Sequence, residues 1–183
     1  PSGDIEEKPY ILFIGTLEPR KNLRRLLSAY QQLKTSLQEK YNLVIVGGHG
    51  WGKDNIQKLA DELGISTHIK MKGYLKHDEM TKVLAKAAML AMPSLYEGFG
   101  LPLLDAMTLG VPVMTSNNSS MPEVTGNASI LVNPYSTASI KDAMEKILTD
   151  KKLRKELIEK GKERANQFSW QKAAIETSQV FDK

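Results

Sequence analysis

The sequence predicts an α/β fold: a Rossmann-like doubly wound parallel sheet with a helical C-terminal tail. Strand-like and helix-like segments alternate strictly between residues 10 and 132, which is the order of a parallel sheet with crossover helices. The strand-like segments are continuous apolar runs, as expected for strands buried on both faces. From residue 135 onward the pattern is wholly helical, and the total of 183 residues suits one ordinary domain.

Each predicted strand is a short apolar run. The six strands are expected at residues 10–15, 43–47, 68–72, 89–93, 111–115 and 129–132. Helices are predicted where apolar residues recur on one face at the helical period. They are expected at residues 22–33, 54–63, 78–87 and 102–109, with the tail formed by 138–148, 151–166 and 170–181. Asn22 is expected to cap the first helix, and the polar run from His77 is expected to begin the third.

The composition excludes several classes of protein. Hydrophobic residues make up 41% and charged residues 25% of the chain, which is typical of a globular domain. The absence of cysteine excludes disulfide scaffolds and thiolate metal sites, and the three histidines lie in separate segments without ligand spacing. No apolar run is long enough to span a bilayer, and the first residues do not resemble a signal peptide. The net charge of +4 favours an anionic partner without identifying it.

Ligands of such sheets bind beyond the carboxyl ends of the strands, so the loops at these ends are the candidate binding segments. These loops are residues 15–22, 47–54, 73–78, 94–102 and 116–123. The first, GTLEPRKN, places Arg20 and Lys21 just before a helix that continues with Arg24 and Arg25. Cations at a helix N-terminus are unfavourable unless an anion lies among them. Anion binding and simple exposure of these side chains to solvent are equally good interpretations.

The second loop, GGHGWGKD, nearly matches the phosphate-binding pattern GxxxxGK[ST]. Asp54, however, stands where that pattern needs a hydroxyl for magnesium, and its carboxylate would repel phosphates. A glycine-rich turn that lets backbones approach closely is therefore favoured over a nucleotidase loop.

The segment 93–107, PSLYEGFGLPLLDAM, is the richest in functional residue types. Glu97 precedes Gly98, Phe99 and Gly100, so backbone N–H groups and a helix N-terminus could face an anion here. Asp105 follows eight residues after Glu97, about one turn inside the helix, and is expected to face the same pocket. The alternative is a surface loop in which Asp105 only supports the helix dipole. Taken together, the loops favour a ligand that carries both phosphate and many hydroxyl groups.

The run SLYEGFGLPLLDAMTLGVPVMTSNNSSMPEV resembles the signature of glycosyltransferase family 4, the retaining sugar-nucleotide transferases of GT-B fold. The motifs GTLEPRKN, GGHGW, MPSLYEGFG, GVPV, MPEV and FSW extend this resemblance over nearly the whole chain. Family members have two Rossmann-like domains. The resemblance implies that residues 1–183 form the C-terminal, donor-binding half of a GT-B fold and that the N-terminal acceptor domain is absent from this chain. The last helix would pack against that absent domain.

The resemblance also implies roles for single residues. Glu97 would contact hydroxyls of the donor sugar, and Asp105, where the family has glutamate, would bind the ribose. Arg20 and Lys21 would hold the diphosphate, and the segment 72–75 would flank the base. The implied substrate-binding residues are Gly15, Thr16, Arg20, Lys21, Gly73, Tyr74, Gly98, Phe99, Gly100, Leu101 and Asp105, with Glu97 as the catalytic residue.

The implied activity is a hexosyltransferase that uses a UDP-, GDP- or ADP-sugar, with mannose as one candidate sugar, and a glycan or lipid-linked acceptor. No metal or cofactor is expected, because protein cations and a helix dipole would stabilise the leaving diphosphate. Nucleic acid is not an expected partner, whereas the protein's own N-terminal domain is. The fragment alone is expected to be inactive, and the full-length protein to be cytoplasmic, at the cytoplasmic face of the membrane. The alternatives are a non-catalytic nucleotide-sugar-binding module and a GT-B epimerase or phosphorylase.

Overall fold

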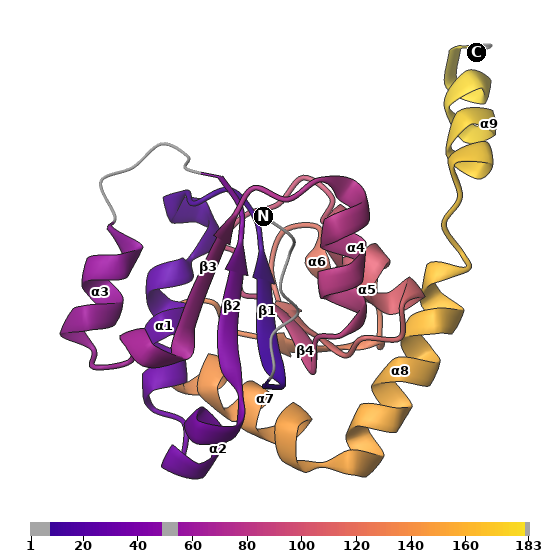
Figure 1. Cartoon of the computed structure of the whole chain (residues 1–183). Coiled ribbons are helices and arrows are strands. Elements are labelled where there is room, and N and C mark those ends of the chain that lie inside the picture. The colour runs from indigo at the N-terminus through magenta and orange to yellow at the C-terminus, as the bar shows by residue number, and fades with distance from the viewer. Residues whose placement is uncertain (1–7, 49–54, 182–183) are drawn as a thin grey trace.

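A computed structural model describes residues 8–48 and 55–181 and shows six parallel strands in one sheet, ordered β3-β2-β1-β4-β5-β6 (Figure 1). The strands are β1 (Tyr10–Ile14), β2 (Asn42–Val46), β3 (Ile69–Gly73), β4 (Met89–Met92), β5 (Val113–Ser116) and β6 (Ser129–Val132). This is the strand order of a doubly wound dinucleotide-binding sheet. The predicted Rossmann-like parallel sheet is confirmed.

Helices cover both faces of the sheet (Figure 1). They are α1 (Leu23–Gln31), α2 (Thr35–Lys40), α3 (Ile56–Glu62), α4 (His77–Ala85), α5 (Leu101–Thr108), α6 (Met121–Thr125), α7 (Thr137–Thr149), α8 (Lys151–Ala165) and α9 (Trp170–Phe181), with 3-10 turns at Pro19–Lys21 and Ser66–His68. One apolar cluster joins the sheet to α1, α3 and α7, and a second joins it to α4, α5 and α6. The sheet is therefore the middle layer of three.

The side chains of β1 show why the interior strands are continuous apolar runs. Ile11 and Phe13 enter one cluster, whereas Leu12 and Ile14 enter the other. The edge strand β3 departs from this prediction, because only Ile69 is buried while its lysines and Met71 are not. An edge strand has a neighbour on one side only, and charged side chains there protect it from pairing with other chains.

Several predicted boundaries were wrong by one or two residues, and two helices were not predicted. The fifth strand begins at Val113, because the Val111 backbone N–H donates to the Ala106 carbonyl at the end of α5. His68 belongs to a 3-10 turn and not to β3. The short helix α2 lies between the predicted helix 22–33 and the predicted strand 43–47, and α6 overlaps the end of the predicted loop 116–123. Most of the phosphate-loop-like motif, residues 49–54, lies outside the described residues.

The last helix sets the tail apart from the body. Figure 1 shows α9 extending away from the sheet and its helices, and none of its residues is buried. Its large apolar side chains Trp170, Ile175, Val180 and Phe181 are exposed. The predicted helical tail is confirmed.

Candidate functional site

The loops that follow β1 and β4 meet above the middle of the sheet. The Lys21 Nζ atom lies 2.6 Å from Glu97 Oε1, and Arg20 Nη1 lies 3.0 Å from Glu97 Oε2. We call these three residues the junction. Because β1 pairs with β2 on one side and with β4 on the other, the junction lies where the chain order reverses. This is the place where doubly wound sheets bind their ligands.

The Lys21–Glu97 ion pair of the junction is largely shielded from water. The side chains of Lys21 and Glu97 are 10% and 8% exposed, so added salt screens their attraction less than it would at the surface. The stem of Lys21 runs along Gly15, where a Cβ atom would lie 3.2 Å from Lys21 Cε. A residue larger than glycine at position 15 would press on the lysine.

Three serines that the sequence analysis did not single out hold Glu97. Ser94 Oγ donates to Glu97 Oε1 at 2.7 Å. Ser119 Oγ and Ser120 Oγ donate to the Glu97 carbonyl at 2.6 and 2.9 Å. Their position in the sequence could have indicated this role. Ser94 closely follows one buried strand, and Ser119 and Ser120 lie in the loop after the next strand.

Asn22 occupies the N-cap position of α1, as predicted, but its side chain does not cap the helix. Its backbone is left-handed, with φ of 61°, and its side chain accepts no hydrogen bond from the backbone N–H groups of the first turn. The amide Nδ2 instead donates to the carbonyls of Pro93 and Pro134, at 2.9 and 2.7 Å. This backbone conformation directs the amide across to the end of β4, so Asn22 ties the two loops of the site together.

The basic residues Arg20 and Arg25 of the first loop and helix have different partners. Arg25 donates to Asn22 Oδ1 and lies over the ring of Tyr135, away from Glu97. Arg20 also donates to Glu18 Oε2, at 2.8 Å. Burial lowers the pKa of Arg20, but the hydrogen bonds and charges of Glu18 and Glu97 outweigh it and raise that pKa. The anion among these cations is thus supplied by the chain itself.

The helix α5 begins at Leu101, four residues beyond Glu97. Gly100 precedes the helix with φ of 96°, a backbone conformation that favours glycine, and a Cβ atom there would also press on the Leu103 side chain. Within residues 8–48 and 55–181, the backbone N–H groups of Phe99, Gly100 and Leu101 have no hydrogen-bond acceptor. These donors and the positive end of the helix dipole are suited to an anion.

Gly15 after β1, Gly47 after β2 and Gly73 at the end of β3 bring their backbones together at the same edge of the sheet. The N–H of Gly15 donates to Val46, and the N–H of Gly47 donates to Gly73. A Cβ atom on Gly47 would lie 1.9 Å from the Gly15 carbonyl oxygen, so no other residue fits. Two predicted site residues lie next to these glycines. Thr16 follows Gly15, and Tyr74 follows Gly73 and is 80% exposed.

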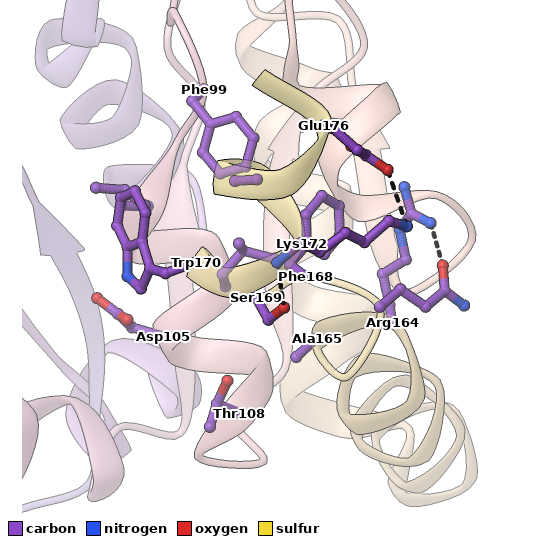
Figure 2. Close-up of a pocket in the computed structure, with 14 residues that line it drawn as sticks. Phe99, Asp105, Thr108, Arg164, Ala165, Phe168, Ser169, Trp170, Lys172 and Glu176 are labelled. Atoms are coloured by element: carbon purple, nitrogen blue, oxygen red, sulfur yellow. Dashed lines mark hydrogen bonds and ion pairs between the residues drawn. The ribbon is translucent and has the colours of Figure 1, made fainter. Parts of the chain in front are cut away.

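Asp105 lies on α5, in surroundings that differ from those of Glu97. It lines a cavity of ≈ 600 Å³ between α5 and the tail, together with Phe99, Leu101 and Trp170, and Glu97 does not line this cavity (Figure 2). The prediction that both carboxylates contact one bound ligand stays a prediction. Burial raises the pKa of the Asp105 carboxyl, and the nearby His77 offsets part of that rise.

Across 8–48 and 55–181, no three His, Asp or Glu side chains are grouped so that they could hold a metal ion. In the same residues, no helix is both long and apolar enough to cross a bilayer. Metal independence and cellular location stay predictions.

Comparison with known proteins identifies the family. The family model for group 1 glycosyl transferases matches residues 1–164. The O-antigen chain mannosyltransferase B of Escherichia coli is 38% identical over 172 residues, which cover 94% of this chain and 45% of that protein. The MMP alpha-(1->4)-mannosyltransferase of Mycolicibacterium hassiacum is 32% identical, over 90% of this chain and 40% of its own length. The chain thus spans less than half of these relatives.

Solved structures agree with the observed fold. Sucrose-phosphate synthase from Thermosynechococcus elongatus superposes with a TM-score of 0.80 at 27% identity, over 96% of this chain and 45% of that one. The Anabaena protein HepE, solved with UDP and glucose, has a TM-score of 0.85 at 17% identity, over 96% and 48% of the two chains. The predicted fold, one Rossmann-like half of a GT-B architecture, is confirmed. This chain belongs to the group 1 glycosyl transferases.

Proposed function

We propose that the chain is the C-terminal, donor-binding domain of a retaining family 4 glycosyltransferase. The enzyme would move a hexose from a nucleoside diphosphate sugar to a glycan or lipid-linked acceptor. The junction carries this proposal: two cations and a carboxylate meet beside the N–H groups of residues 99–101, which have no acceptor among the described residues, at the place where such a sheet binds ligands. The chain spans 45% of its E. coli relative, which suits a donor domain whose acceptor domain lies elsewhere in the full-length protein.

The proposed roles follow from charge and position. Arg20, Lys21 and the N-terminus of α5 bind the diphosphate. As the sugar–phosphate bond breaks, negative charge grows on the leaving diphosphate, and these fixed positive groups stabilise it without a metal. Glu97 accepts hydrogen bonds from sugar hydroxyls, and its charge stabilises the positive character that develops at the reacting carbon.

The nucleoside would lie farther along the same edge of the sheet. Asp105 would accept hydrogen bonds from the ribose, and Gly73 and Tyr74 would flank the base. Asp105 is one methylene shorter than the glutamate of the family pattern. The proposal therefore requires the ribose to approach α5 more closely than in proteins with glutamate.

The choice of sugar in the proposal comes from the relatives. Two of them, from Escherichia coli and Mycolicibacterium hassiacum, are named as mannosyltransferases. We therefore propose mannose as the first sugar to test, with GDP-mannose as its donor. UDP-glucose is the second probe, because a protein of the same fold was solved with UDP and glucose.

Calorimetry with the chain tests the proposal. The titrants are UDP, GDP and ADP, followed by the sugar derivative of whichever binds. The double substitution Arg20→Ala/Lys21→Ala should weaken nucleoside diphosphate binding about 100-fold, since each lost charged contact contributes ~1.4 kcal/mol. Lys58→Ala/Lys155→Ala removes the same charge from exposed sites on α3 and α8 and should leave affinity within about twofold. Equal affinity of the first double variant and the wild type would overturn the diphosphate assignment.

A transfer assay tests whether donor binding and acceptor binding belong to different domains. We propose that the isolated chain binds a donor but does not transfer its sugar, because the acceptor would be held by the N-terminal domain. Transfer by the full-length protein and none by the chain is the expected result. Donor binding without transfer by the full-length protein would favour a non-catalytic nucleotide-sugar-binding module.

A further inference from the structure

We propose that Glu97 makes the site discriminate between a nucleotide sugar and the bare nucleoside diphosphate, by competing with the diphosphate for Arg20 and Lys21. The inference rests on the proposed function, because it requires the diphosphate to bind at the junction. It gives Glu97 a role in addition to contact with the sugar: the residue weakens binding of the product that remains after transfer.

The geometry of the junction shows that the carboxylate engages both cations at once. Its Oε1 accepts from Lys21 Nζ at 2.6 Å and from Ser94 Oγ at 2.7 Å. Its Oε2 accepts from Arg20 Nη1 at 3.0 Å. The two groups best suited to hold a diphosphate are thus already bound to an anion of the chain itself.

An incoming diphosphate has to share these cations or displace the carboxylate. Sharing brings like charges close together, and displacement leaves Glu97, whose side chain is 8% exposed, without its cationic partners. Both outcomes cost binding free energy. A nucleotide sugar offsets this cost, because its sugar hydroxyls donate new hydrogen bonds to the carboxylate. A bare nucleoside diphosphate has no hydroxyl at that place, so it bears the full cost.

Glu18 provides a matched control for the charge of Glu97. Its Oε2 lies 2.8 Å from Arg20 Nε, and its side chain is 15% exposed, so it is a comparable carboxylate on the same cation. In the described part of the chain it makes no ion pair with Lys21. Neutralising Glu18 frees one contact of Arg20 on the side away from Glu97. It should change the affinity for donor and product by the same factor.

The experiment measures dissociation constants by calorimetry for wild type, Glu97→Gln and Glu18→Gln, with UDP and UDP-glucose and with GDP and GDP-mannose. Glu97→Gln should bind the nucleoside diphosphate about tenfold tighter than wild type, since a difference of ~1.4 kcal/mol is tenfold. It should bind the nucleotide sugar no tighter than wild type, so the preference for the sugar form falls about tenfold. Glu18→Gln should leave that preference within about twofold. Circular dichroism confirms that each variant is folded.

Glu97→Asp keeps the test decisive if Glu97→Gln does not fold. It retains the charge and withdraws the carboxylate by one methylene, so it should shift the preference in the same direction by a smaller factor, about threefold. If the diphosphate binds wild type but no tighter to either variant, the discrimination by Glu97 is wrong while the proposed function stands. If no nucleotide binds to wild type or variants, the proposed function fails, and this inference fails with it.

Discussion

The junction above β1 and β4 and the cavity between α5 and α9 contain the two predicted carboxylates, but in opposite settings. At the junction, Glu97 accepts hydrogen bonds from Lys21, Arg20 and Ser94 and is nearly inaccessible to water. In the cavity, Asp105 lies beside the exposed ring of Trp170, and burial raises its pKa without an ion pair among the described residues.

The difference shows which part of the site is built by the fold of this chain. The junction is held by the ends of two neighbouring strands, so its side chains are positioned by the sheet itself. One wall of the cavity comes from α9, which has no buried residue. We expect substitutions at the junction to cost much more stability than substitutions in the cavity.

The largest expected effect is that of Lys21→Met. Removing this cation leaves the buried Glu97 carboxylate with Arg20 and Ser94 alone, and breaking a buried ion pair from one side costs about 3 kcal/mol. Urea denaturation followed by circular dichroism measures the loss. Arg20→Met is the control, because this side chain is 39% exposed and should cost about 1 kcal/mol or less. Equal losses for the two variants would contradict the description of the junction.

The next effect is that of Asn22→Ala, with an expected loss of about 2 kcal/mol, also from urea denaturation. The substitution leaves the Pro93 and Pro134 carbonyls without their buried donor. Asn22→Asp keeps the size and the left-handed preference of the side chain but lacks both N–H donors. It should therefore be destabilised by a similar amount, and wild-type stability of Asn22→Asp would rule out this role of the amide.

A smaller effect, with a definite pH dependence, is expected for Asp105→Asn. Because burial raises the pKa of Asp105, the folded chain binds this proton more tightly than the unfolded chain. This tighter proton binding stabilises the fold fully at pH values below the pKa that the carboxyl has in the unfolded chain. The stabilisation is lost as the pH rises through the pKa that it has in the folded chain. The variant should thus unfold at a higher temperature than wild type at pH 7, and at nearly the same temperature at about pH 3. A stabilisation that is larger at the acidic pH would contradict the sign of this shift.

The smallest effect is expected for Trp170→Ser. The side chain is 78% exposed on a helix with no buried residue, so the free energy of unfolding should change by less than about 0.5 kcal/mol. A loss above about 2 kcal/mol would show that α9 contributes to the core of the folded chain, and the contrast between the two regions would then be wrong.

The sheet was predictable because strands that are buried on both faces have a recognisable sequence pattern. Ile11 and Phe13 face one helix layer and Leu12 faces the other, so the strand becomes a continuous apolar run. The short helices α2 and α6 were not predictable in this way. Six or fewer residues give too little of the helical period for a pattern to be recognised.

The site was predictable as separate loops but not as an ion-paired cluster. Arg20, Lys21 and Glu97 were each singled out, but their contacts join residues 76 and 77 positions apart. Local sequence therefore suggested an external anion for the cations. The order of strands contained the missing information, since the commonest doubly wound order places the first and fourth strands side by side. The prediction that the Asn22 side chain caps α1 was wrong for a different reason. The capping preference of asparagine does not reveal that its backbone is left-handed here.

The central claim is that a nucleoside diphosphate binds at the junction, and amide chemical-shift mapping during a titration with UDP, GDP and ADP tests it most directly. We expect one of the three to shift the amide signals of Lys21, Glu97, Phe99, Gly100 and Leu101 more than those of α8 and α9. Saturable shifts centred elsewhere, or no shifts with any of the three at millimolar concentration, would contradict the claim.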